Sequence, residues 1–379
     1  MKMDIENFTP GHYEENCGYK YFVPQKINTV WQWNLPEINQ LLEKAAIKLG
    51  ELNSFSKLVP NIDLFIQMHV TKEAVISSRI EGTRTQIDEA LMPVEEINEE
   101  RRNDWKEVNN YISAINEAIS QLERLPISSR LIRNTHSMLL EDVRGQYKMP
   151  GEYRTSQNWI GGASIADARY IPPHHSLLND LMGDLENFIN NESQMPDLIK
   201  IAIIHYQFET IHPFLDGNGR IGRLLITLYL VSKGILDKPL LYLSAFFEKN
   251  KSLYYQNLAD VKERGAMVQW IKFFLVGVQQ TSCEAVDTLS KVLKFKEETE
   301  NQIRDTFGRR ASNAVILFHN LLKRPATSIE QVMGKCNLSY KSANDLVKDF
   351  VKIDILEETT GQSRNRFFRM KPYLEIFRG

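Results

Sequence analysis

The segment from His212 to Arg223, HPFLDGNGRIGR, constrains the fold more than any other stretch of the chain. Its glycines Gly217 and Gly219 permit the positive φ angles of a tight turn and let the backbone approach a ligand closely. The apolar residues that follow have helical spacing, and residues 199 to 211 upstream have the pattern of an amphipathic helix. We therefore predict a helix, a glycine-rich loop and a second helix.

The start of the second helix is an expected binding place for anions. Free backbone N–H groups and the positive end of the helix dipole lie there, and Asn218 can add a side-chain amide. Arg220 and Arg223 are three residues apart, so they can grip successive phosphates of a polyphosphate. Asp216 is a hard oxygen ligand of the kind that Mg²⁺ uses together with substrate phosphates. His212, with an ordinary pKa near ~6.5, suits a base that accepts a proton from an attacking hydroxyl.

Two common phosphate-binding loops are excluded by the same segment. It lacks the G-K-[ST] ending of a Walker A loop, and a helix precedes it instead of the strand that a dinucleotide-binding fold requires. A single histidine beside a proline usually packs or caps a helix, and single arginines are usually solvated. The intact order and spacing of the whole segment nevertheless favour a functional site.

The segment resembles the HxFx(D/E)GNGRxxR signature of Fic-domain proteins, and all fixed positions match. The resemblance implies transfer of AMP from ATP onto a hydroxyl group of a target protein or of the chain itself. It implies that His212 is the general base, that Asp216 binds Mg²⁺ and that Phe214 anchors the loop in the core. Relatives that phosphorylate their targets carry Lys at position 217, so Gly217 favours AMP transfer.

The resemblance also implies which residues bind ATP. Gly217, Asn218 and Gly219 would cradle the α- and β-phosphates, Arg220 would hold the β-phosphate and Arg223 the γ-phosphate. The full ATP-binding set of this segment is expected to be Gly217, Asn218, Gly219, Arg220, Ile221, Gly222 and Arg223.

A second motif lies far upstream, where residues 77 to 82, SSRIEG, close a helix that is predicted to start near Asp63. Gly82 is a plausible residue to end this helix, with Glu81 as its last helical residue. The motif resembles the (S/T)xxxE(G/N) inhibitory motif of Fic proteins, with Ser77, Glu81 and Gly82 at its fixed positions. The resemblance implies that Glu81 pairs with Arg223 and keeps it from the γ-phosphate. In some relatives this glutamate aligns a water that removes AMP, so addition and removal both stay open.

Residues 155 to 169, between GEYR and YIPPHH, resemble a short hairpin. In Fic proteins this position holds a flap that pairs with an extended target segment by strand addition. The resemblance implies a target protein docked at residues 155 to 169, with Ile160 as the clamp and with Ile160, Gly161, Gly162 and Ala163 in contact with ATP. A surface hairpin without a partner is the alternative.

Residues 241 to 262 also look like the family. Tyr254 and Tyr255 are expected to pack near the nucleotide, while Lys262 stands where several relatives have Asn. His136, His174, His175 and His205 are expected to be structural, because isolated histidines usually are.

The C-terminal part, from Arg310 onward, is basic, with 12 Lys+Arg against 7 Asp+Glu. Its pattern predicts a helix over 311 to 322, a second helix opened by a capping box of Ser328 and Gln331, a third helix over 340 to 353 and a hairpin. This is a winged-helix outline.

Such a domain often places its third helix in a DNA groove. The side chains that could reach phosphates are Lys341, Lys348, Arg364 and Arg366. Asp345 and Asp349 lie on the same helix, however, so DNA binding by residues 310 to 379 is not favoured over dimerisation or target recognition.

The bulk properties fit a chain of 379 residues with two or three domains. We expect a mainly α fold with a Fic-type helical core, a small β-hairpin flap and a winged-helix domain. The expected parts are an N-terminal helical extension (1–100) with the inhibitory helix (63–82), a catalytic domain (101–283), a connecting helix (284–309) and a winged-helix domain (310–379).

Three distant cysteines suggest neither a disulfide framework nor a zinc site. The N-terminus has no apolar targeting region, and no apolar run is long enough to span a membrane, so we expect a cytoplasmic protein. The net charge of −2 gives no overall attraction to nucleic acid or lipid. Relatives suggest a homodimer.

Two rival functions stay open: a winged-helix transcriptional regulator that senses a nucleotide, and a relative that transfers another phosphate-linked group. The sequence names neither the target and its acceptor residue nor the event that relieves inhibition.

Overall fold

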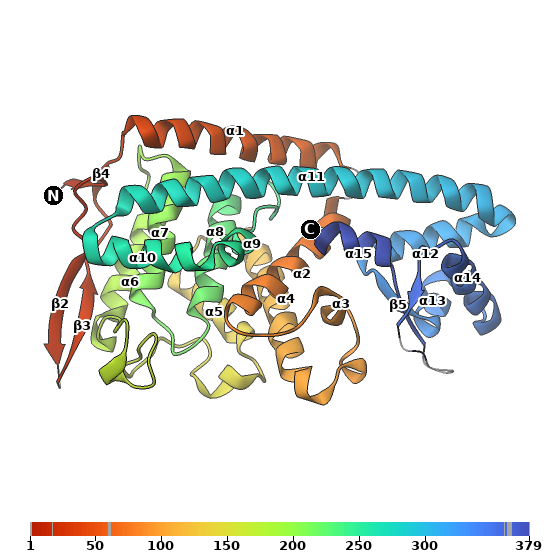
Figure 1. Cartoon of the computed structure of the whole chain (residues 1–379), viewed down its shortest axis with the longest axis horizontal. Coiled ribbons are helices and arrows are strands. Elements are labelled where there is room, and N and C mark those ends of the chain that lie inside the picture. Colours follow the sequence, from red (N-terminus) through yellow and green to blue (C-terminus); the bar gives the residue numbers. More distant parts are fainter. Residues whose placement is uncertain (1, 17, 60–61, 360, 362–365, 379) are drawn as a thin grey trace.

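Helix α11, Met267–Phe307, is the longest element of the structure, a computed structural model that describes residues 2–16, 18–59, 62–359, 361 and 366–378 (Figure 1). It packs along α1, Pro36–Leu58, on one side and reaches the C-terminal elements at its far end. The fold is mainly α, as predicted. The predicted boundary after residue 283 falls inside α11. Residues 284 to 307 form the C-terminal portion of this helix, and residues 308 and 309 follow in a short 3-10 helix.

The first 35 residues form strands, which the sequence did not reveal. Strands β1, Lys2–Asp4, and β4, Val30–Gln32, pair in parallel, and β2, Gly11–Asn16, pairs antiparallel with β3, Tyr19–Pro24. The Phe22 N–H donates to the Ile171 carbonyl over 3.0 Å. This bond ties the hairpin to the segment that follows the predicted flap.

The helices of the catalytic part surround α7, Asp197–Ile211. Its neighbours include α1, α6, Leu178–Asn190, α8, Asn218–Ser232, and α11. The expectation of an amphipathic helix over residues 199 to 211 was wrong, because neighbours cover this part of α7 on all sides and only Glu209 among these residues is partly exposed. Lys200 satisfies its buried ammonium by donating to the Asn191 carbonyl over 2.6 Å.

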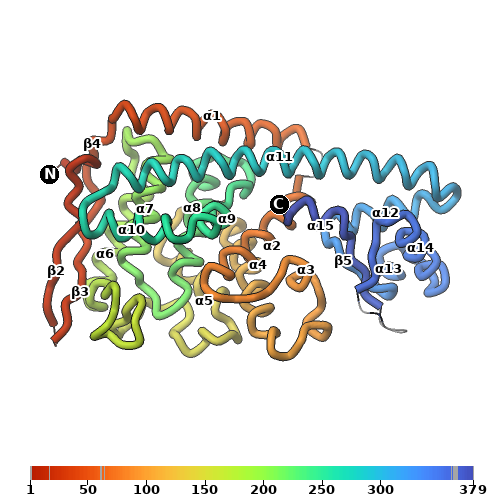
Figure 2. Tube along the Cα trace, viewed as in Figure 1, coloured from red at the N-terminus to blue at the C-terminus, as the bar shows by residue number. Residues whose placement is uncertain are grey.

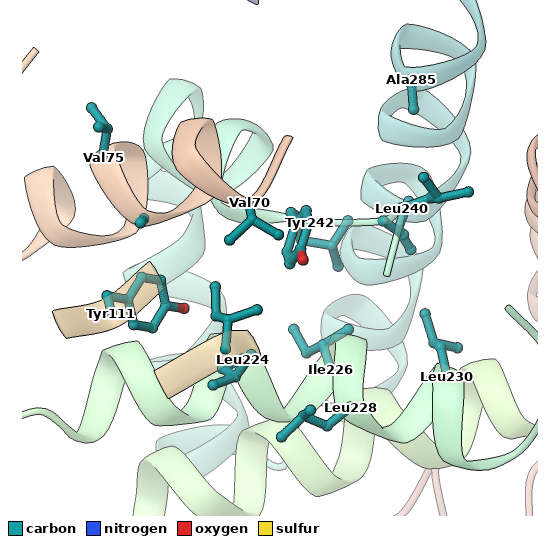
Figure 3. Close-up of a cluster of buried hydrophobic side chains, with 14 of the residues drawn as sticks. Val70, Val75, Tyr111, Leu224, Ile226, Leu228, Leu230, Leu240, Tyr242 and Ala285 are labelled. Atoms are coloured by element: carbon teal, nitrogen blue, oxygen red, sulfur yellow. The ribbon is translucent and has the colours of Figure 1, made fainter. Parts of the chain in front are cut away.

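The remaining helices of this part extend the bundle on both sides of α8. They are α2, Ile62–Ile80, α3, Ile87–Ala90, α4, Arg102–Leu122, α5, Ser129–Leu139, α9, Ser244–Lys249, and α10, Lys251–Arg264. Figure 3 shows side chains of α2, α4, α8 and α11 meeting in one apolar cluster. Tyr111 of α4 is buried there, and its hydroxyl contacts Glu73 of α2 at 3.3 Å and donates to the Arg220 carbonyl of α8 at 3.2 Å.

The C-terminal part contains the elements predicted for it, in the predicted order. They are α12, Ala311–Lys323, β5, Ala326–Ser328, α13, Ile329–Cys336, α14, Tyr340–Lys352, β6, Glu357–Glu358, β7, Phe367–Arg369, and an unpredicted last helix α15, Lys371–Arg378. The strands form one sheet in the order β5-β7-β6, and the Ser328–Gln331 capping box is present. The winged-helix assignment itself stays a prediction.

The C-terminal part does not lie free at the end of α11. Helix α15 folds back against α2 and α3, and α12 contacts α2 (Figure 2). Phe377 of α15 packs against Phe65 of α2 with ring centroids 5.8 Å apart. Helix α2, which carries the predicted inhibitory motif, therefore has the helices around α7 on one side and the C-terminal part on another.

Trp270 is the buried side chain through which α11 holds α7. It is fully buried, and its indole Nε1–H donates to the Ala202 carbonyl over 2.8 Å. Trp270→Ala leaves a cavity and an unpaired carbonyl, so we expect the free energy of unfolding to fall by ~3–5 kcal/mol in urea denaturation followed by circular dichroism. Ile47→Ala on the exposed face of α1 is the control and should change it by less than about 0.5 kcal/mol.

Candidate active site

The glycine-rich loop begins with a left-handed residue. His212 ends α7 with φ 50° and ψ 60°, and the following Pro213 cannot continue the helix. Gly217 also has a positive φ, 76°, and directly precedes α8. The predicted helix, loop and helix are therefore present, with the sharp turns at the two ends of the loop.

Asn218 closes this loop instead of facing a ligand. Its Oδ1 accepts from the Phe214 N–H at 2.9 Å, and its Nδ2 donates to the Phe214 carbonyl at 2.8 Å. The prediction that its side-chain amide faces phosphate was wrong, because both polar atoms are used within the loop. Only its backbone at the helix start is left to meet an anion.

A histidine from another helix supports the same loop. His136 of α5 stacks on Phe214 with ring centroids 3.7 Å apart, and Phe214 is fully buried as predicted. The His136 Nδ1 accepts from the Gly151 N–H at 2.9 Å, and its Nε2 lies 2.9 Å from the Asp216 carbonyl. Burial lowers the pKa of His136 to about 4, so the ring is neutral and donates from Nε2. The structural role predicted for it is confirmed.

His212 is held in its strained conformation by Arg154, the last residue of GEYR. The Arg154 Nε–H donates to the His212 carbonyl over 3.0 Å, and its Nη2 donates to the Pro173 carbonyl over 2.5 Å. Burial, and the nearby positive charge of Arg154, lower the pKa of His212 to about 4. The imidazole is therefore neutral at physiological pH and free to accept a proton.

Arg223 is buried and already has its bonding partners. Its Nη2 donates to Glu81 Oε1 at 2.7 Å and to the Ser77 carbonyl at 2.9 Å, and its Nε donates to Ser77 Oγ at 2.9 Å. Burial alone would raise the pKa of Glu81, but the Arg223 guanidinium outweighs it and holds that pKa below its ordinary range. The Glu81–Arg223 ion pair expected from the inhibitory motif is present.

The inhibitory motif sits on one face of α2. This helix ends at Ile80, one residue before the predicted last helical residue Glu81, and Gly82 takes φ 107°. Glu73, Ser77 and Glu81 follow one another at intervals of four residues, so they point the same way. Glu73 is buried, accepts from Ser244 Oγ at 2.5 Å, and has its pKa raised to about 7 by burial. A row of acidic and polar groups therefore faces α8.

Arg220 lies behind the loop. Its Nη1 is 3.3 Å from Glu107 Oε2 and its Nη2 is 3.5 Å from Asp216 Oδ1, and both Arg220 and Glu107 are buried. Asp216 keeps nearly half of its side chain exposed, and its Oδ1 accepts from the Gly217 N–H at 2.6 Å. Only Asp216 of these side chains opens to solvent.

A cavity of about 1150 Å³ opens beside the loop and α8. Its lining unites predicted residues from three distant segments: Glu81, Ile160, Gly161, His212, Gly219 and Arg223. Gly219 is required there, because a Cβ at this position would lie 2.3 Å from Glu81 Oε1 and 2.9 Å from Arg223 Nη1. The predicted base and the predicted γ-phosphate ligand therefore share one space.

Two predicted ATP contacts on α8 lie away from the cavity. The Ile221 side chain is buried in the core, and its N–H donates to the Gly217 carbonyl within the helix. Gly222 faces Glu209, since a Cβ there would lie 2.2 Å from Glu209 Oε1. The ATP contacts of Ile221 and Gly222 stay predictions, and the helix turns both residues toward the protein interior.

The flap is present but only half of its predicted contacts reach the cavity. Ile160 forms an isolated antiparallel bridge with Tyr170, and Ile160 and Gly161 line the cavity. Gly162 packs on the Asp167 carbonyl, and the Ala163 N–H donates to Asp167 Oδ2 at 2.9 Å. The ATP contacts of Gly162 and Ala163 stay predictions, and both residues turn back onto the flap itself.

Glu209 and Lys251 are among the cavity residues that the sequence reasoning missed. Glu209 lies one helical turn before His212; burial raises its pKa to about 7, and its Oε1 has no hydrogen-bond partner in the described part of the chain. Lys251, at the start of α10, donates from Nζ to the Ile80 carbonyl over 2.9 Å. The spacing of Glu209 to His212 signalled the first, whereas Lys251 could be placed only by the fold.

The tyrosines predicted to lie near the nucleotide also line the cavity. Tyr254 is buried and bonded to His205 Nε2 at 2.9 Å, and Tyr255 is nearly half exposed. His205 Nδ1 donates to the Gly222 carbonyl over 2.9 Å, in agreement with the predicted structural role. Lys262, where several relatives have Asn, places its Nζ 4.1 Å from the Tyr170 ring centroid.

Two protein-family models match successive parts of the chain. Residues 39–120 match the Fic/DOC family N-terminal region, and residues 126–230 match the Fic/DOC family. The chain therefore carries a Fic N-terminal domain and a Fic domain. In the described part of the chain, no helix has the length and apolarity needed to cross a membrane.

Curated relatives carry names that state an activity. A probable protein adenylyltransferase of Aquifex aeolicus (strain VF5) is 30% identical over 213 residues, which cover 55% of this chain and 59% of the relative. The protein adenylyltransferase Fic of Drosophila virilis is 26% identical over 191 residues, covering 48% of this chain and 36% of the relative. The chain thus spans less than two thirds of the length of either relative.

Solved structures agree on the fold. A Fic family protein from Desulfovibrio desulfuricans G20 superposes with a TM-score of 0.57 at 20% identity, over 89% of this chain and 96% of that chain. Fic-1 (residues 134–508) from C. elegans gives a TM-score of 0.50 at 22% identity, over 67% of this chain and 71% of that chain. The structural similarity therefore supports the assignment of the Fic fold.

The depressed pKa of His212 can be measured directly. In ¹³C-histidine spectra of the eight histidines, the signal absent from His212→Ala should keep its neutral chemical shift from pH 8 to pH 5.5, because its pKa is about 4. In Glu81→Gly that pKa should fall further, since the negative charge of Glu81 favours the imidazolium. A titration midpoint near ~6.5, the ordinary histidine value, would show that the ring is solvated.

Proposed function

We propose that this chain transfers AMP from ATP onto a tyrosine, serine or threonine hydroxyl of a target protein or of itself. The observation that carries the proposal is the shared cavity, in which neutral His212, the start of α8 and Arg223 face one space. Its volume lies at the upper end of what ligand sites in proteins offer. The names of the curated relatives support the same activity.

The proton transfer and the stabilisation of the phosphates use groups at or beside this cavity. His212 accepts the proton of the attacking hydroxyl, whose oxygen bonds to the α-phosphorus. The bond from the α-phosphorus to the bridging oxygen breaks, and pyrophosphate leaves in line. The N–H groups at the start of α8 and the Arg223 guanidinium stabilise the negative charge on the phosphates. Pyrophosphate carries away the electron pair of the broken bond.

Asp216 fits a Mg²⁺ ion that is held jointly with the nucleotide. Its carboxylate is nearly half exposed beside the helix start, and only one of its oxygens bonds the Gly217 N–H. Mg²⁺ takes one or two carboxylates plus substrate phosphates, and the described residues contain no cluster of three or more candidate ligands that would form an all-protein cage. When bound, the ion would neutralise phosphate charge.

Glu81 acts as an internal brake in this proposal. Its carboxylate occupies the guanidinium face of Arg223 that the γ-phosphate needs, and Ser77 holds the rest of that side chain. ATP bound without Arg223 would place its α-phosphorus badly for attack. Removal of AMP, for which relatives use the same glutamate, and transfer of another phosphate-linked group remain the nearer alternatives.

The flap supplies the expected docking place for the target. Residues 155 to 169 border the cavity, and Trp159 and Ile160 expose about two fifths of their surface there. An extended target segment would add as a strand beside Ile160, whose side chain would clamp the residue to be modified. A homodimer remains an expectation from relatives.

DNA binding by residues 310 to 379 remains the less favoured alternative. Lys341 and Lys348 are exposed, but Arg366 is engaged by Asn344 at 2.5 Å and Glu358 at 3.6 Å. Arg364 lies outside the described residues. A nucleotide-sensing regulator would bind ATP in a Glu81→Gly variant without transferring anything.

Label from α-³²P-ATP should report both the activity and the brake. Glu81→Gly frees Arg223, so labelling of the chain or of a partner should rise at least tenfold, in keeping with ~3–5 kcal/mol for a buried pair broken from one side. His212→Ala in the Glu81→Gly background should remove the labelling, because no base remains. Glu192→Gly, an exposed loop carboxylate, serves as the control and should label like the parent. Equal labelling of Glu81→Gly and parent contradicts the brake.

Lys251 is expected to strengthen the brake from outside the ion pair. Its ammonium caps the last turn of α2 at the Ile80 carbonyl, where a positive charge is favourable. Lys251→Met should raise basal labelling about threefold to tenfold, in line with ~0.5–1.5 kcal/mol for one hydrogen bond, and Lys251→Arg should restore the low level. If basal labelling stays unchanged while the KM for ATP rises in Glu81→Gly, Lys251 is a nucleotide ligand instead.

A further inference from the structure

A second cavity lies on the other side of the inhibitory helix. Its volume is about 540 Å³, within the range of small-molecule sites. Its walls come from α2, from the segment around α3, and from the C-terminal elements β7 and α15. It shares no lining residue with the cavity beside His212, to which this segment contributes only Glu81, just after the end of α2.

Helix α2 presents different faces to the two cavities. Lys72, Val75, Ile76 and Arg79 line the second cavity at intervals of three and four residues, which defines one stripe of a helix. Glu73, Ser77 and the following Glu81 form the stripe that faces Arg223. A group that contacts the first stripe therefore acts on the element that positions Glu81.

Ion pairs between α3 and the C-terminal part hold the walls of this cavity together. Asp88 pairs with Arg369 at 2.6 Å and also with Arg378, and the Arg324 Nη2 donates to the Leu91 carbonyl over 3.0 Å. Asp88 keeps only 13% of its side chain exposed. The cavity walls are therefore held together by contacts at the rim, whereas the space between them stays open.

The lining indicates what the space can hold. Its floor is apolar, formed by side chains such as Val75, Ile76, Phe367 and Phe377. Its arginines have acidic partners, Arg79 with Glu248 and Arg369 with Asp88. Lys72 is half-buried on the wall, and it has no ion pair within 4.0 Å in the described part of the chain. Burial lowers the pKa of Lys72, and the negative charge of Glu284, which forms no ion pair with it, only partly opposes this effect, so an anion beside the ammonium would be favourable.

We propose that this cavity is a regulatory ligand site for a small organic anion with an apolar body, whose charge pairs with Lys72. The site itself follows from the cavity and its lining. Its regulatory effect rests on the proposed function. A ligand that bridges α2 and the C-terminal part stabilises the contact between them, and this stabilisation grows with the ligand concentration relative to its dissociation constant. Bound ligand therefore strengthens the brake and lowers AMP transfer.

Fluorescent probes of matched shape test the site on the full chain. 8-Anilinonaphthalene-1-sulfonate carries an apolar body and one negative charge, and N-phenyl-1-naphthylamine has the same body without the charge. We expect saturable binding of the sulfonate at one site per chain, undisturbed by ATP. Lys72→Met should weaken the sulfonate at least fivefold and leave the neutral probe unchanged.

Two variants fill the space from opposite walls, so that one unstable protein cannot decide the result. Val75→Trp enters from α2 and Thr359→Trp from the C-terminal side, and either should weaken both probes at least tenfold. Displacement of the sulfonate by ATP, or unchanged binding in folded Val75→Trp and Thr359→Trp, overturns the site.

The regulatory part has its own readout. Saturating sulfonate should lower basal labelling from α-³²P-ATP at least threefold in the parent chain, and it should have no effect in Lys72→Met or in Glu81→Gly. Binding without any change of labelling rejects the regulatory effect but leaves the site. Loss of labelling in His212→Ala combined with no probe binding rejects the site and leaves the proposed function intact.

Discussion

A buried guanidinium needs a negative partner, and this need organises the centre of the molecule. Arg223 is almost fully withdrawn from water, so leaving it unpaired is strongly unfavourable. Glu81 supplies the partner in the described structure, and Ser77 accepts hydrogen bonds from the Nε and Nη2 of Arg223. A triphosphate offers the same charge to the same donors. In the proposed function, inhibition and ATP binding therefore satisfy the same electrostatic need of Arg223, and they exclude each other.

The strength of the Glu81–Arg223 ion pair depends on how firmly α2 is held in place. Glu73 anchors the helix to Ser244, Lys251 caps its end at Ile80, and Arg79 reaches Glu248 at 3.5 Å. Glu73 and Glu209 both have their pKa raised to about 7 by burial, so their charge changes near neutral pH on either side of Arg223. The Glu81–Arg223 ion pair therefore lies near two further carboxyl groups and is not isolated.

The sequence predicted what local chemistry determines. The loop between two helices, the core role of Phe214 and the Glu81–Arg223 pair follow from residue type and spacing, together with the family resemblance. The capping box at Ser328 is likewise local. What the sequence could not place depended on packing partners: the Asn218 side chain turns to Phe214, Ile221 and Gly222 face inward, and Ala163 bonds Asp167. No pattern in one segment states which side of a helix its distant neighbours will cover.

The same limit applies at larger scale. The stripe of polar residues expected on α7 did not form a solvent face, because neighbours enclose that helix. The predicted connecting helix, residues 284 to 309, lies mostly in α11, which begins earlier, at Met267. The hairpin of β2 and β3 was missed because its residues carry no strong turn signal beyond Gly18. In each case the tertiary surroundings outweighed the local pattern.

The 41 residues of α11 have a mechanical consequence. At about 1.5 Å per residue the helix is roughly 60 Å long, and it contains no proline at which it would kink. It behaves as a stiff rod whose two halves belong to different packing units. The helix therefore resists bending when the small sheet at its far end moves. Movement of that sheet relative to α2 would instead rearrange the side contacts near Asp88.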